Sequence, residues 1–359
     1  MRVFERRSVL CLWLSLVWLG ASGCAIVGPA SIRDGRLAYN EAVQVTSDQE
    51  LLLNIVRLRY RDTPTILQIA NIATQLNLEG RLSSSWSILS EDRFSVGGNG
   101  IYYERPTISY RPVTGQAFIQ QMLEPVANDK LMLLYNAGWP VDTLFGLTVQ
   151  SISGVQNAPG ASGPTPEVDP KFRQFRSVLQ AFRDLQRAGQ LTIGRKGNKA
   201  EMRIGADPGL KKQTDLLYKT LRLRPDAESY EIAQATNPFN RTSITIVPRS
   251  LMSTLFFLAQ GVEAPEDDIR AERVFTAQFA NGKEIDWQQV TGGIFRVRSS
   301  TLRPGNSYVS VHYRGTWFFI DDSDLNSKTT FALVSQLFAM QSGNIRNAGP
   351  ILTLPVGGG

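Results

Sequence analysis

The first 23 residues constrain the chain most, because they have the form of an export signal that is removed from the mature protein. Arg2, Arg6 and Arg7 give a basic start, and an apolar run follows at residues 9–19. That run is shorter than the ~20 residues that a helix needs to span a bilayer. The sequence therefore predicts a signal peptide over 1–23 and a mature chain that begins at residue 24.

The signal ends in Ala21-Ser22-Gly23-Cys24, which resembles the lipobox of bacterial lipoproteins. In that family the cysteine sulfur takes a diacylglycerol thioether, the peptide is cut before the cysteine, and the new amine is acylated. The resemblance implies cleavage between Gly23 and Cys24 and a lipid anchor on Cys24. Ala25, which is not acidic, implies release to the outer membrane, facing the periplasm. An ordinary cleaved signal with an unrelated cysteine and an uncleaved membrane anchor are the alternative interpretations.

The composition excludes several classes of protein. One histidine excludes a His-rich metal site, and two cysteines exclude a disulfide framework or a zinc ribbon. The net charge of +6 is too small to indicate a nucleic-acid partner. Apolar residues make up 42% of the chain, which is enough for a packed core. Cys11 leaves with the signal, so Cys24 becomes the only cysteine, as suits an oxidising envelope.

Hydrophobic periodicity and turn residues predict an α+β fold of two domains, with mixed or antiparallel sheets flanked by helices. Residues 24–45 are expected to form a lipidated tether, followed by an N-terminal α+β domain at 46–152. Glycines and prolines between Gly154 and Pro166 predict a linker at 153–169. The C-terminal α+β domain would then cover 170–359.

Individual elements follow from the same patterns. Thr46 and Gln49 have the spacing of a capping box, which predicts a helix at 47–60 that Pro64 ends. Gly97-Gly98-Asn99-Gly100 predicts a turn. The other helices are expected at 114–124, 128–137, 170–188, 209–221, 249–260 and 325–341. Strands are expected at 66–73, 82–88, 101–110, 191–193, 200–204, 229–234, 242–247, 294–298, 307–313 and 316–320.

A strand runs through a short turn into a helix three times, at about 108–123, 244–259 and 317–340. This echo is consistent with a repeated ββα unit. It is equally what an ordinary α+β chain shows, since little residue identity accompanies it.

The helix at 170–188 carries its basic residues opposite its apolar stripe, which contains Phe172, Phe175, Leu179 and Phe182. The guanidinium groups suit phosphate and carboxylate partners, such as lipid headgroups or wall polymers. An ordinary solvated helix face is the alternative. The candidate anion-binding residues are Arg173, Arg176, Arg183 and Arg187. A second basic group comprises Arg57, Arg59 and Arg61.

The densest acidic cluster contains Asp321, Asp322 and Asp324, just before the last predicted helix. An EF-hand loop starting at Asp322 fails at its sixth position, Ser327, and at its twelfth, Leu333. Capping of the helix, with Asp324 as N-cap, is the favoured interpretation, and a divalent ion or catalytic carboxylates are the alternatives. His312 is expected to be a surface residue, because no nucleophile motif accompanies it.

The mature chain also resembles an uncharacterised family of proteobacterial lipoproteins, through the segments at 35–42, 50–60 and 317–322. The resemblance supports a place in the cell envelope and brings no activity, cofactor or catalytic residue. We expect a lipid-anchored structural or assembly component with envelope protein partners, no cofactor and no nucleic-acid partner. A periplasmic hydrolase with carboxylate chemistry and a carrier of an apolar ligand are the alternatives.

Overall fold

The first described element is a helix at residues 37–59 in the computed structural model. Its first part is largely exposed, whereas Leu52, Ile55 and Leu58 in its second part are buried. The structure describes residues 37–65, 67–86, 94–112, 116–164, 171–233, 240–278, 284–291, 293–342 and 352–355.

This helix corrects two predictions. Thr46 is not an N-cap, because it lies inside the helix and its hydroxyl donates to the carbonyl of Ala42 at 2.8 Å. The tether predicted at 24–45 is helical from residue 37 onward. The physical reason is propensity, since residues 37–45 contain no glycine or proline and include leucine, alanine and glutamate.

The helix ends before Pro64, at a residue with left-handed backbone. Arg61 has φ 60°, and the N–H of Asp62 donates back to the carbonyl of Arg57 at 2.9 Å. This six-to-one hydrogen bond is the Schellman arrangement, in which glycine is the usual residue.

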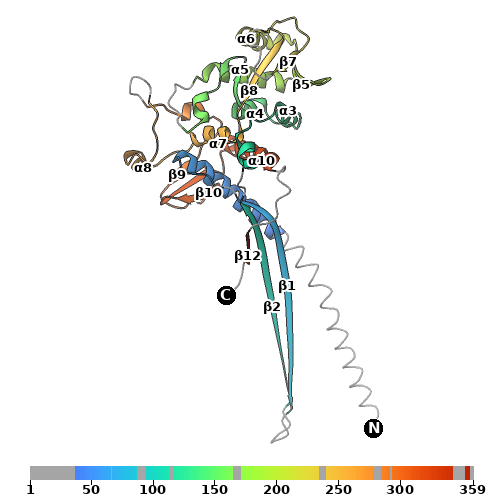
Figure 1. The fold of residues 1–359 in the computed structure, drawn as a ribbon, viewed down its shortest axis with the longest axis vertical. Helices are drawn as coiled ribbons and strands as arrows, with labels where there is room; N and C mark the ends of the chain where they lie inside the picture. Colours follow the sequence, from blue (N-terminus) through green and yellow to red (C-terminus); the bar gives the residue numbers. More distant parts are fainter. Residues whose placement is uncertain are drawn as a thin grey trace.

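Two long strands form a hairpin that extends away from the rest of the fold (Figure 1). β1 (Leu67–Trp86) pairs antiparallel with β2 (Phe94–Pro112), from Leu67 opposite Pro112 to Trp86 opposite Phe94. The ladder is about 65 Å long at ~3.3 Å per residue. A short strand, β12 (Leu352–Pro355), pairs with β2 over residues 107–110.

The hairpin differs from the prediction of three separate strands with a turn at 97–100. Gly97, Gly98, Asn99 and Gly100 all lie within β2, opposite residues 80–83 of β1. Glycine signals a turn in sequence, but it also fits an extended strand when a partner strand fixes the backbone.

The largest sheet has six strands in the order β4-β3-β8-β7-β6-β5. β7 and β8 are parallel, and every other neighbouring pair is antiparallel. The strands are β3 (Val149–Ile152), β4 (Val155–Gln156), β5 (Leu191–Lys196), β6 (Lys199–Ile204), β7 (Tyr230–Ala233) and β8 (Ser243–Pro248).

The linker predicted at 153–169 is wrong for its described part, residues 153–164. β3 lies between β4 and β8, so the sheet contains strands from both sides of the predicted boundary. Ala158 and Ala161 are buried, and a 3₁₀ turn, η1 (Pro159–Ser162), follows. Glycine and proline here shape a tight buried connection, which composition alone does not distinguish from a linker.

A smaller antiparallel sheet has the order β10-β11-β9. Its strands are β9 (Arg298–Ser300), β10 (Ser307–Tyr313) and β11 (Thr316–Asp321). The helices are α2 (Gln116–Leu123), α3 (Asn128–Asn136), α4 (Val141–Thr148), α5 (Arg173–Arg187), α6 (Lys211–Thr220), α7 (Leu251–Ala259), α8 (Glu266–Arg270), α9 (Gln288–Thr291) and α10 (Leu325–Ser342). The chain therefore has an α+β fold, as predicted.

The three strand-to-helix passages do not repeat one unit. β2, β8 and β11 lead into α2, α7 and α10, but each strand belongs to a different sheet. β2 and β11 each follow an antiparallel partner, whereas β8 is parallel to the preceding β7.

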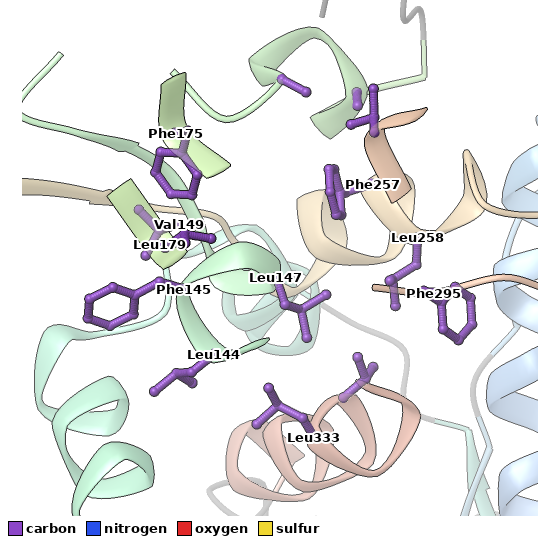
Figure 2. Close-up of a cluster of buried hydrophobic side chains, with 14 of the residues drawn as sticks. Leu144, Phe145, Leu147, Val149, Phe175, Leu179, Phe257, Leu258, Phe295 and Leu333 are labelled. Atoms are coloured by element: carbon purple, nitrogen blue, oxygen red, sulfur yellow. The ribbon is translucent and has the colours of Figure 1, made fainter. Parts of the chain in front are cut away.

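The buried apolar residues form one cluster, to which both sides of the predicted boundary contribute. Figure 2 shows Leu144, Leu147 and Phe145 of α4 near Phe175 of α5 and Leu333 of α10. Phe145 and Phe182 meet edge to face, with ring centroids 6.5 Å apart. None of the helices in the described ranges is both long enough and apolar enough to cross a membrane.

Candidate functional site

A cavity of about 420 Å³ lies beside α5, and we call it the α5 pocket. α5 supplies one wall, and the other is supplied by the first turns of α10 with Val290, Gly293 and Ile294. The start of α4 contributes Asp142 and Thr143. Its volume falls within the range of small-molecule sites, ~300–1,000 Å³.

The rim of the α5 pocket carries three of the four predicted anion-binding residues, namely Arg176, Arg183 and Arg187. They recur on α5 because its apolar stripe faces the core and leaves the arginines at the edge of that stripe. Arg173 is also on α5 and is exposed, but it does not line the pocket. The structure thus brings three of these residues together and leaves the fourth apart.

Arg176 is held in place by backbone carbonyls. Its Nη2 donates to the carbonyls of Gln289 at 2.6 Å and Val290 at 3.3 Å. The guanidinium also lies over the ring of Phe172, 4.9 Å from its centroid. Burial lowers the pKa of Arg176 below its usual value.

Arg183 connects the rim to the start of α4. Its Nη1 donates to Oε1 of Gln186 at 2.7 Å, and that oxygen also accepts the N–H of Val141 at 2.9 Å. Its Nε lies 3.6 Å from Oδ1 of Asp142, beyond hydrogen-bond distance. Arg183 is therefore oriented by its hydrogen bond to Gln186 and by a loose ion pair with Asp142.

Part of the pocket lining is apolar. Phe175 is buried against the core, and Leu179 lies beside it (Figure 2). Val290, on the facing segment, is also buried. α10 adds Thr329 and Thr330, whose hydroxyls donate to the carbonyls of Leu325 at 2.7 Å and Ile294 at 2.8 Å. The pocket can therefore hold a ligand that has both an anionic and an apolar part.

The acidic cluster at 321–324 behaves as predicted for a helix cap. Asp324 precedes α10, and its Oδ1 accepts the N–H of Ser327 at 3.1 Å. Asp321 accepts from Ser323 and pairs with Arg298 at 3.1 Å. The Ser323 hydrogen bonds, with a smaller contribution from Arg298, lower the pKa of Asp321.

We expect Asp324→Ala to lower the free energy of unfolding by about 1 kcal/mol, because an N–H in the first turn of α10 loses its acceptor. Urea unfolding followed by circular dichroism measures the change. Asp322→Ala is the matched control, since Asp322 makes only a surface pair with Lys328 and should change stability by less than about 0.5 kcal/mol. Equal losses in the two variants would contradict the capping role.

Of the other candidate residues that the structure describes, His312 and Arg59 contact neighbouring residues of the fold. His312 is exposed on β10, as predicted, and its ring lies beside Trp317 with centroids 5.2 Å apart. In the second basic group, Nη1 of Arg59 donates to the carbonyl of Phe275 at 3.0 Å, and burial lowers the pKa of Arg59 to about 10. Within the described ranges, no three acidic, histidine or cysteine side chains gather as metal ligands would. Gly23 and Cys24 lie outside the described residues.

Sequence reasoning missed Arg249, which is 1% exposed and among the largest fully buried side chains in the described part of the chain. Its Nη1 donates to the carbonyls of Leu147 and Val149, each at 3.0 Å, at the end of α4. Its Nε donates to Oγ of Ser162 at 2.8 Å, and its Nη2 donates to the carbonyl of Asn157. Burial lowers the pKa of Arg249 to about 9, so the guanidinium stays protonated at neutral pH.

The far wall of the α5 pocket was also missed. Asn326, Thr329 and Thr330 are polar residues at spacings of three and four on α10, and that spacing is the signal that could have placed them on one face. Nothing in the sequence places that face opposite α5, because the contact joins segments ~150 residues apart. Comparisons with protein-family models, with curated protein sequences and with solved structures find no match to this chain.

Proposed function

We propose that this protein is a lipid-anchored component of the bacterial cell envelope that acts in structure or assembly and performs no chemistry of its own. The lipobox-like end of the signal supports the anchor at Cys24 and a position on the periplasmic side of the outer membrane. The hairpin β1–β2 is the observation that carries the assembly role.

The register of the hairpin sorts its residues onto two unlike faces. Ile72, Leu76 and Leu78 fall on one face, and Tyr102 and Ile108 of β2 are paired on that same face. The opposite face is mainly polar, as the following pairs illustrate: Asn71 with Ser109, Gln75 with Arg105, Arg81 with Asn99 and Ser85 with Ser95. Glu104 on the first face, and Ile101 and Tyr103 on the second, are exceptions.

An amphipathic ladder of two strands requires a partner. A two-stranded hairpin is marginally stable at best in water, because it cannot bury its apolar face. No described strand pairs with the outer edge of β1, and β12 covers only residues 107–110 of β2. Such edges are templates for another strand. We infer that the hairpin binds an extended strand and an apolar surface of an envelope partner.

The experiment is photo-crosslinking in cells. A photoreactive amino acid at Leu76, on the apolar face of the hairpin, should give covalent adducts with envelope proteins. The same group at the exposed His312 of β10 is the control and should give few. Adducts from membranes fractionated by density would identify the partner. If both positions give the same adducts, or Leu76 gives none, the assembly role is wrong.

A further inference from the structure

The α5 pocket carries more positive charge than its own carboxylate balances. Arg176, Arg183 and Arg187 line it, and Asp142 is the acidic residue that the lining contains. The carboxylate of Asp184, the residue after Arg183, is hydrogen-bonded to other side chains. Its two oxygens accept from Gln180 at 3.0 Å and Gln213 at 3.2 Å. The lining therefore has a net charge of about +2 at neutral pH.

The guanidinium groups keep donors for a ligand. The guanidinium of Arg187 makes no hydrogen bond or ion pair with any residue in the described part of the chain. Arg183 uses one nitrogen on Gln186, and Arg176 uses Nη2 alone on the two carbonyls. Each guanidinium has five N–H donors, so most of them remain available.

Along α5, the pocket has two arginines at one end and Arg176 among apolar residues at the other. Arg183 and Arg187 are four residues apart, hence neighbours on the helix surface, ~6 Å along its axis. Leu179 lies one turn from Arg183, and Phe175 lies two turns from it, next to Arg176. Arg176 is ~10 Å from Arg183 along the helix axis. An anionic group between Arg183 and Arg187 would thus adjoin the apolar wall.

We propose that the α5 pocket binds a phosphomonoester whose apolar substituent lies against Phe175, Leu179 and Ile294. The planar guanidinium matches phosphate oxygens with two parallel hydrogen bonds, and a pair of arginines holds a dianion. A phosphomonoester carries a charge of about −1.5 to −2 at neutral pH, which complements the lining better than a single carboxylate does. The cavity of about 420 Å³ is larger than a phosphate needs, so the substituent occupies the remainder.

The inference does not depend on the lipid anchor or on the hairpin. Phosphomonoesters in an envelope come from two sources, namely membrane lipids with a terminal phosphate and small soluble phosphate esters. Both present the same headgroup to Arg183 and Arg187.

The test is calorimetric titration of the full chain, in a nonionic detergent, with hexyl phosphate and with inorganic phosphate. Hexyl phosphate should bind more tightly than inorganic phosphate, because its chain adds apolar burial. Arg187→Gln should weaken hexyl phosphate binding about tenfold or more, since charge-assisted hydrogen bonds are lost. Arg173→Gln, on the same helix but outside the pocket, is the matched control and should bind as the wild type does.

Arg183→Gln is a second variant and should also weaken binding, with folding checked by its thermal unfolding midpoint. Glycerol 3-phosphate and phosphatidic acid dissolved in the same detergent are then added as competitors, and whichever displaces hexyl phosphate identifies the source. The proposal is overturned by any of three results. These are equal losses in Arg187→Gln and Arg173→Gln, no preference for hexyl phosphate over inorganic phosphate, and displacement by neither competitor.

Discussion

Replacing Arg249 by methionine is expected to lower the free energy of unfolding by about 3–5 kcal/mol, the range seen when one partner of a buried charged network is removed. Methionine fills similar space but donates no hydrogen bond. The carbonyl of Leu147, the carbonyl of Asn157 and Oγ of Ser162 would then lose the donor that Arg249 supplies. Each buried acceptor left without a donor costs roughly 1–3 kcal/mol.

The variant would also lose a cation–π contact, because the guanidinium of Arg249 lies 4.1 Å from the centroid of the Phe257 ring. Thermal unfolding of the purified full-length protein measures the change, with an expected fall in Tm on the order of 10 °C. Arg270→Met is the matched control, since Arg270 is 74% exposed and pairs only with Asp267 on α8. Equal small shifts in the two variants would mean that the carbonyl cage around Arg249 contributes little.

If the proposed anchor is present, replacing Cys24 by serine is expected to abolish lipidation completely, because the thiol sulfur of Cys24 would form the bond to the diacylglycerol. One acyl chain holds a protein to a membrane only reversibly, whereas two or more make the attachment stable. The variant should accumulate as a precursor that retains residues 1–23. The wild-type protein should fractionate with outer membranes.

Metabolic labelling with a tagged fatty acid, followed by gel analysis and membrane fractionation, checks the result. Cys11→Ser is the matched control, because Cys11 lies in the predicted signal and should leave labelling unchanged. An unlabelled wild-type protein together with normal processing of Cys24→Ser would refute the lipoprotein proposal.

Local patterns predicted the elements whose stability is local. α5 follows from apolar residues three and four apart. The strands expected at 191–193 and 200–204 are β5 and β6, and the chain turns between them at Gly197, which has φ 62°. Asp324 was predicted as a cap because a cap depends on residues a single turn apart. Three arginines of the α5 pocket could be named for the same reason, since they lie on one helix.

The rest depends on contacts between distant segments. Arg249 resembles any surface arginine in sequence, and only the fold brings the end of α4 and the residues around Asn157 to it. The sheet order places β8 between β3 and β7, which composition at 153–169 does not reveal. The length of β1 and β2 was underestimated because their serines and glycines are weak strand formers, and the pairing partner determines the extended backbone.

The helix at 37–59 has a mechanical consequence, because its exposed start and its buried end belong to one continuous rod about 35 Å long. Tension applied at its first turns travels along backbone hydrogen bonds in series and reaches the core at Leu52 and Ile55. The rest of the fold cannot rotate freely about a point within this helix, such as residue 47, so its orientation follows the direction of the helix axis. A pull on the amino end therefore loads the hydrophobic interior directly, with no slack chain between residues 37 and 59 to absorb it.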